Sequence, residues 1–111
     1  MKDCQAKHFE SQRYTACWCP ECDQVKVKCG NVLLPFKTKQ VEPFLTFLED
    51  MYKRQISEQK KKSVQFKFAE LSFTFMADEL EDLTDLLRMV KIEIQREQLE
   101  ALFYSGERHI A

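Results

Sequence analysis

The sequence predicts one α+β domain, residues 1–111, in which two ββα units follow each other along the chain. Three observations support this prediction: a strand pair of alternating polarity, a second such pair 39 residues later, and an amphipathic helical pattern after each pair. We expect the four strands to form one antiparallel sheet with both helices on its apolar face. Residues 1–23 are rich in cysteine and are expected to form an arm beside this domain.

The first strand pair is organised around Gly30-Asn31, a two-residue turn signal between two runs of alternating apolar side chains. A turn of this length sets Cys29 opposite Val32, Val27 opposite Leu34 and Val25 opposite Phe36. All six side chains then share one face, so the turn length and the hydrophobic pattern predict the same register.

The second unit repeats the first without a gap. The first unit spans residues 24–54 and the second spans residues 64–104. A shift of 39 residues aligns the apolar positions from Val64 to Leu87 with those from Val25 to Leu48. Ala69-Glu70 replaces the Gly-Asn turn, which predicts a looser second hairpin. Residues 55–63, which include three consecutive lysines, are expected to be an exposed linker between the units.

Two helices are expected, over about residues 41–54 and residues 78–104. Apolar and polar residues alternate over residues 89–95, so a short strand is a rival there. We favour a helix because this stretch contains no helix breaker. The second helix is longer than a small sheet can cover. Its apolar tail therefore predicts self-association through residues Leu99, Leu102, Phe103 and Tyr104.

Composition and charge exclude several classes of function. The net charge of −1 argues against a dedicated binder of phosphate backbones, and two glycines cannot supply a dinucleotide-binding or Walker loop. No stretch is long and apolar enough to cross a bilayer, and the first 20 residues contain no continuous apolar run. We therefore expect no membrane association, no secretory signal and a cytoplasmic location. Residues 1–63 carry a net charge of +4 and residues 64–111 carry a net charge of −5. This asymmetry fits either a solvated acidic helix face or two oppositely charged surfaces that pair.

The most chemically distinctive motif is Cys19-Pro20-Glu21-Cys22, whose spacing suits two thiolate ligands of tetrahedral zinc. Cys4 and His8 are candidates for the other two ligands, and Cys17 could replace either of them. Structural thiols without a metal are the alternative interpretation. Five cysteines without a signal peptide indicate a reducing compartment rather than a disulfide framework, and Cys29 fits a buried strand position.

Catalysis has little support in the sequence. A redox Cys-x-x-Cys commonly lies at a helix N-terminus, whereas this motif is expected to join two strands. The two histidines, His8 and His109, lie at opposite ends of the chain, and no serine or carboxylate pairing stands out. We therefore expect a protein that is not an enzyme, with a thiol oxidoreductase as a remote alternative.

A nucleic-acid-binding regulator is the main alternative function. It would use lysines of the polar sheet face and of the linker to contact phosphate: Lys26, Lys28, Lys67 and Lys60, Lys61 and Lys62. The aromatic side chains of the strands, including Phe66 and Phe73, are expected on the opposite, helix-covered face. A platform for base stacking is then missing, which disfavours this alternative.

The first half of the chain resembles a family of small bacterial domains of uncharacterised function. The resemblance lies in the N-terminal Cys4, the Cys19-x-x-Cys22 motif and the strand that ends in Gly30-Asn31. It implies a bacterial cytosolic protein in which Cys4, Cys19 and Cys22 act together, and it implies no activity. Taken with the residues themselves, it leads us to expect a binding or assembly module, zinc-stabilised and dimeric.

Overall fold

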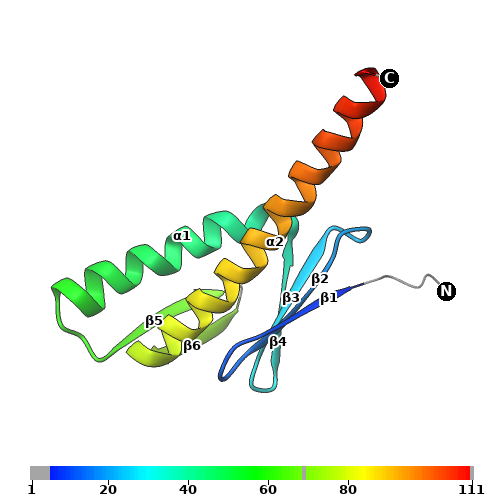
Figure 1. The fold of residues 1–111 in the computed structure, drawn as a ribbon. Coiled ribbons are helices and arrows are strands. Elements are labelled where there is room, and N and C mark those ends of the chain that lie inside the picture. Colours follow the sequence, from blue (N-terminus) through cyan, green and yellow to red (C-terminus); the bar gives the residue numbers. More distant parts are fainter. Residues whose placement is uncertain (1–5, 69, 111) are drawn as a thin grey trace.

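The computed structural model describes residues 6–68 and 70–110 and shows an α+β protein with two antiparallel sheets (Figure 1). The larger sheet has the order β1-β2-β3-β4, with strands Lys7–Glu10, Thr15–Cys19, Gln24–Cys29 and Val32–Lys37. Residues 1–23 were expected to form an arm beside the sheet, but they supply its first two strands instead. A strand before the Cys19–Cys22 motif was expected, but the strand over residues 7–10 and the pairing of both strands with the sheet were not. Phe9, Ala16 and Trp18 all point toward the helices.

The hairpin of β3 and β4 has the predicted register. Cys29 pairs with Val32, Val27 with Leu34 and Val25 with Phe36. Gly30 has a φ of 64°, a left-handed conformation that glycine adopts without the steric cost of a Cβ atom.

Strands β5 (Ser63–Phe68) and β6 (Leu71–Met76) form a second sheet of two strands. Their pairing puts Val64 opposite Phe75 and Phe66 opposite Phe73. We expected this hairpin to complete a sheet with β3 and β4. That part of the prediction is wrong, because β2 occupies the edge of β3 and the four-stranded sheet is complete without β5 and β6.

The helical segments differ from the prediction mainly at their ends. A short 3-10 turn, η1 (Thr38–Gln40), precedes α1 (Val41–Met51), and α1 continues as a π-helix, η2 (Tyr52–Glu58). The predicted linker therefore begins inside a helix. Helix α2 (Ala77–Ile110) has 34 residues, runs past the predicted end at residue 104 and is helical throughout residues 89–95.

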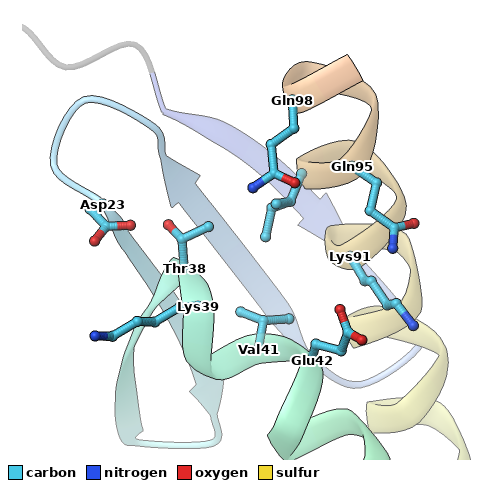
Figure 2. Close-up of a pocket in the computed structure, with 9 residues that line it drawn as sticks. Asp23, Thr38, Lys39, Val41, Glu42, Lys91, Gln95 and Gln98 are labelled. Atoms are coloured by element: carbon cyan, nitrogen blue, oxygen red, sulfur yellow. The ribbon is translucent and has the colours of Figure 1, made fainter. Parts of the chain in front are cut away.

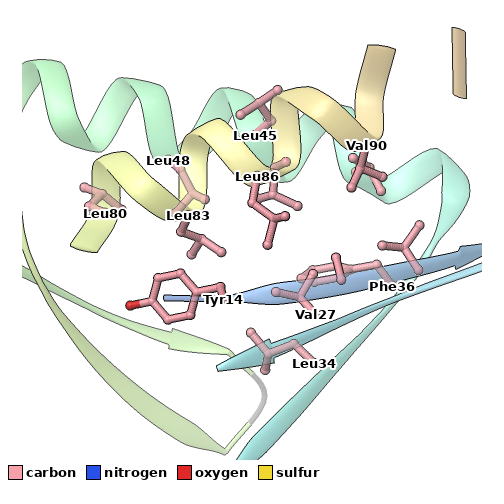
Figure 3. Close-up of a cluster of buried hydrophobic side chains, with 14 of the residues drawn as sticks. Tyr14, Val27, Leu34, Phe36, Leu45, Leu48, Leu80, Leu83, Leu86 and Val90 are labelled. Atoms are coloured by element: carbon pink, nitrogen blue, oxygen red, sulfur yellow. The ribbon is translucent and has the colours of Figure 1, made fainter. Parts of the chain in front are cut away.

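The hydrophobic core lies between the two helices and the strands (Figure 3). Helix α2 contributes one row of fully or almost fully buried residues, which we name the core stripe: Leu80, Leu83, Leu87, Val90 and Ile94. These positions recur at spacings of three and four residues, so they lie on one face of the helix. Helix α1 packs beside α2 with Leu45 and Leu48, and the sheet contributes Val25, Val27 and Leu34.

The C-terminal part of α2 extends away from the rest of the molecule (Figure 1). The radius of gyration is 16.4 Å, whereas a compact chain of this length has one of about 13 Å. Of the side chains described in α2, none beyond Ile94 is buried. This projecting segment is therefore available for contact with a partner.

Candidate functional site

The candidate zinc ligands His8, Cys17 and Cys19 lie on the face of the larger sheet that points away from the helices. His8 and Cys17 are directly opposite each other in the register of β1 and β2, and Cys19 follows on the same face. Side chains in such a pair have Cβ atoms about 5 Å apart. Cys22 is exposed in the turn between β2 and β3, and Cys4 lies outside the described residues.

Within residues 6–68 and 70–110, no three His, Cys, Asp or Glu side chains converge in a way that could hold a metal ion. The structure brings His8 next to Cys17 and leaves Cys22 in the turn. A tetrahedral zinc site requires four ligands. The described part of the predicted set therefore supplies a neighbouring pair rather than a complete site.

The Cys19–Cys22 segment forms the turn that leads directly into β3, as the sequence predicted. The Asp23 amide closes this turn by donating a hydrogen bond of 3.3 Å to the Pro20 carbonyl, and Asp23 has a left-handed φ of 56°. The Asp23 carbonyl in turn accepts a hydrogen bond from the Thr38 amide at 3.4 Å. These contacts fix the turn against η1 and so position both cysteines relative to the start of α1.

Cys29 has a different environment from the other described cysteines. It lies on the helix-covered face of β3 and packs against the core. Burial raises the pKa of its thiol from 9.0 to about 11, so the thiol remains protonated near neutral pH. The protonated form is a poor nucleophile, and the position suits a small apolar side chain.

The polar face of the larger sheet carries Lys26 and Lys28 on β3, close to His8 and Cys17. A shallow hollow of about 390 Å³ lies over this face and is lined by His8, Phe9, Glu10, Thr15, Ala16, Cys17, Lys26, Lys28 and Leu33. Lys67 belongs to β5 in the other sheet. The continuous lysine face expected from the sequence is therefore divided between two sheets.

A cavity of about 250 Å³ lies between the Cys19–Cys22 turn, the start of α1 and the middle of α2 (Figure 2). Its lining is Asp23, Thr38, Lys39, Val41, Glu42, Lys91, Ile94, Gln95 and Gln98. The Trp18 indole N–H donates a hydrogen bond of 3.2 Å to the Thr38 hydroxyl beside it. Two acids, two lysines and two glutamines make this cavity polar and balanced in charge, and its lining contains no cysteine, histidine or serine. This lining offers hydrogen-bond donors and acceptors of both charges.

A second apolar row runs along the outside of α2 and continues onto its projecting part. We name it the outer stripe: Met89, Ile92, Leu99, Leu102 and Phe103, which are between 40% and 71% exposed. Three of these residues, Leu99, Leu102 and Phe103, belong to the tail that the sequence singled out for self-association. Tyr104 is the fourth residue of that predicted tail, and its side chain lies outside the part of the chain that the structure describes.

Sequence reasoning missed the role of Asp82. The Asp82 carboxylate, in the acidic first turns of α2, accepts hydrogen bonds from the Ser11 hydroxyl at 2.8 Å and from the Gln12 and Arg13 amides at 3.1 and 2.9 Å. Burial acts to raise the pKa of Asp82, but these hydrogen bonds outweigh it and lower the pKa. The carboxylate therefore attaches the β1–β2 turn to α2.

A second contact of this kind joins β1 to α2 at Lys7. Its ammonium donates to the carboxylates of Glu93 and Glu97, the latter at 2.5 Å, and lies 5.8 Å from the centre of the Trp18 ring. The hydrogen bonds from Arg96 and Lys7 lower the pKa of Glu93 from 4.5 to about 2. No signal in the sequence of residues 1–23 identified this contact.

Comparison with protein-family models, with curated proteins and with solved structures finds no match to this chain. Among the described helices, none is both long enough and apolar enough to span a bilayer.

Proposed function

We propose that this protein is a non-catalytic assembly module that pairs with a second copy of itself through the outer stripe of α2. The observation that supports the proposal is the presence of five large apolar side chains on a helix that projects from the body (Figure 1). Contiguous exposed apolar surface of this kind is typical of interaction sites.

The spacing of the outer stripe matches a two-stranded coiled coil. Met89, Ile92, Leu99 and Phe103 fall on the a and d positions of a heptad, and Arg96 takes the remaining a position. Met89 and Ile92 each lie two residues beyond a core-stripe position, as Met89 follows Leu87, and the heptad spacing continues the same face to Leu99 and Phe103. Two residues correspond to about 200° around the helix axis, so this face lies nearly opposite the core stripe. Two chains joined by their outer stripes would therefore keep their folded bodies on the outside.

The area available supports a weak but specific dimer. The exposed parts of the five side chains amount to roughly 600 Å² per chain, so a pair of chains would bury roughly 1,200 Å², the lower end of the range for specific interfaces. We therefore expect a dimer that dissociates on dilution.

Charge favours a parallel pair. In a parallel heptad register Arg88 of one chain lies beside Glu93 of the second copy, whereas an antiparallel register places Glu93 and Glu100 against acids of the other helix. Arg96 at the helix interface is neutralised by Glu93 and Glu100 of its own helix. A polar residue at one a position also favours a single register.

The experiment is sedimentation or light scattering of Leu99→Glu and Leu33→Glu over a dilution series. Leu99 and Leu33 are 55% and 54% exposed, but Leu33 lies on the polar face of the larger sheet. We expect Leu99→Glu to be a monomer at concentrations where wild type and Leu33→Glu are dimers. A monomeric wild type, or a dimer that only Leu33→Glu disrupts, contradicts the proposal.

We also propose that zinc stabilises the β1–β2 region through Cys4, His8, Cys19 and Cys22, with Cys17 as a possible substitute ligand. The pairing of His8 with Cys17 on the face that also carries Cys19 supports this. Metal analysis of purified protein is expected to give about one zinc per chain, and less in His8→Ala. Folded protein without metal contradicts the proposal.

Two further interpretations belong to the same proposal. A tandem origin of the two ββα units is supported by the order β3-β4-α1 and β5-β6-α2 and by the equal registers of the two hairpins. A cytoplasmic location is supported by the chemistry of a zinc–thiolate site, which needs reduced cysteines.

A further inference from the structure

A third cavity lies where α1 ends, at the opposite end of the molecule from the projecting part of α2. It measures about 340 Å³ and is lined by Phe47, Met51, Arg54, Gln55, Gln59, Lys61, Gln65 and Phe66. Phe47 is 45% exposed, whereas Leu45 and Leu48 of the same helix are buried. The Phe47 ring packs against Phe44 and Phe66, and its exposed part borders the cavity.

The backbone around this cavity departs from regular structure in two places. Helix α1 widens into the π-helix η2, in which the Gln59 amide donates to the Arg54 carbonyl at 3.1 Å. Lys60 then adopts a left-handed φ of 59°, and the Lys61 amide donates to the Gln55 carbonyl at 2.8 Å. π-Helical turns and left-handed residues other than glycine are costly and are found preferentially at functional sites.

The irregular backbone brings polar groups around an aromatic wall. Phe47 and Phe66 meet edge to face, with ring centres 5.7 Å apart and planes at 83°. Both are lining residues, so flat apolar surface borders the cavity beside Met51. Three glutamine amides stand around it and can each donate and accept hydrogen bonds.

The charge of the lining has one sign. Arg54 and Lys61 are its charged residues, and no carboxylate lines the cavity although the chain has 18 acidic residues. Arg54 forms an ion pair with Asp50 through one terminal nitrogen. A guanidinium has five N–H donors, so Arg54 retains donors for a second anion.

From this arrangement we propose that the cavity at the end of α1 binds a small anion that carries a planar aromatic group, with a nucleoside monophosphate as the ligand class. The aromatic wall supplies the stacking surface, the glutamine amides match the polar edges of a base, and Arg54 with Lys61 supplies the cationic contacts for the phosphate. The volume lies within the usual range of small-molecule sites, about 300–1,000 Å³. This site is separate from the outer stripe and does not depend on dimerisation.

To test the proposal, the protein is titrated with adenosine monophosphate, adenosine, inorganic phosphate and 2-naphthoate. Binding is measured by calorimetry and by changes in amide chemical shifts. We expect adenosine monophosphate to bind more tightly than adenosine or phosphate alone, with shifts centred on Gln55 and Phe66. The naphthoate titration shows whether an aromatic carboxylate meets the same requirement as a nucleotide. Binding of phosphate as tight as that of the nucleotide overturns the proposal, as does the absence of nucleotide and naphthoate binding at millimolar concentration.

Two variants remove the two kinds of contact. Phe47→Ala should weaken binding of adenosine monophosphate about tenfold through lost stacking, and Arg54→Gln should weaken it about tenfold through the lost charge-assisted hydrogen bonds. Leu33→Ala and Lys28→Gln are matched controls, because they remove an exposed apolar and an exposed cationic side chain from the other sheet. Equal affinity in the two site variants and the two controls contradicts the proposal. Unchanged circular dichroism verifies that each variant is folded.

Discussion

The two stripes of α2 contain similar residues in opposite environments. The core stripe is almost fully buried under the helices and strands, whereas the outer stripe is 40% to 71% exposed. Both recur at helical spacings, with Arg96 in the place of one apolar residue of the outer stripe, so local sequence does not distinguish them. The difference comes from the rest of the chain, because α1 and the strands cover one face of the first half of α2 as far as about Ile94. Beyond that point Arg96 pairs with Glu93 and Glu100, which supports the helix without packing.

The largest difference between the stripes should appear in matched leucine substitutions. Leu87→Ala removes a fully buried side chain and should lower the free energy of unfolding by about 2–5 kcal/mol. Leu99→Ala changes an exposed side chain of the same helix and should alter it by less than about 0.5 kcal/mol. Urea unfolding at a concentration where the protein is monomeric measures both. Equal losses would show that the projecting part of α2 packs in solution.

A smaller effect is expected where the buried half of α2 holds the β1–β2 turn. Asp82→Ala removes three hydrogen bonds and should cost about 1–2 kcal/mol, reduced by the access of water to the Gln12 and Arg13 amides. Glu81→Ala is the control, because it removes an exposed acid from the same helical turn. Faster hydrogen exchange at the Gln12 and Arg13 amides in Asp82→Ala alone would localise the effect. The same loss in Glu81→Ala would assign it to the helix dipole instead.

The smallest effect concerns Glu93, which lies between the two stripes. Its pKa of about 2 in the folded protein is below its usual 4.5, so the folded chain retains the charge more strongly than the unfolded chain. The resulting stabilisation is present above pH 4.5 and is lost as the pH falls toward 2. The difference in melting temperature between wild type and Glu93→Gln should therefore shrink over this interval. A difference that stays constant with pH would mean that Lys7 and Arg96 do not hold this carboxylate in solution.

The sequence was informative where one periodicity dominated. The register of β3 and β4 followed from the turn at Gly30 and the alternation around it, and the amphipathic pattern after each strand pair predicted both helices. Prediction from the sequence failed where contacts between distant parts of the chain determine the structure. Nothing local to residues 7–19 shows that β2 pairs with β3, and nothing local to Asp82 shows that its partner is a turn 70 positions earlier. Phe47 and Leu45 are both apolar residues on α1, and only the packing of α2 determines which one is buried.

The attachment of the β1–β2 turn to Asp82 has a consequence for the order of folding. The ribosome releases β1 and β2 first, but the carboxylate that holds their turn emerges about 70 residues later. The contact between this turn and Asp82 therefore closes a loop that spans most of the chain, and the entropic cost of closing that loop arises late. During synthesis the Cys19–Cys22 turn is consequently exposed to the surrounding thiols and metal ions before the first strands are anchored to α2.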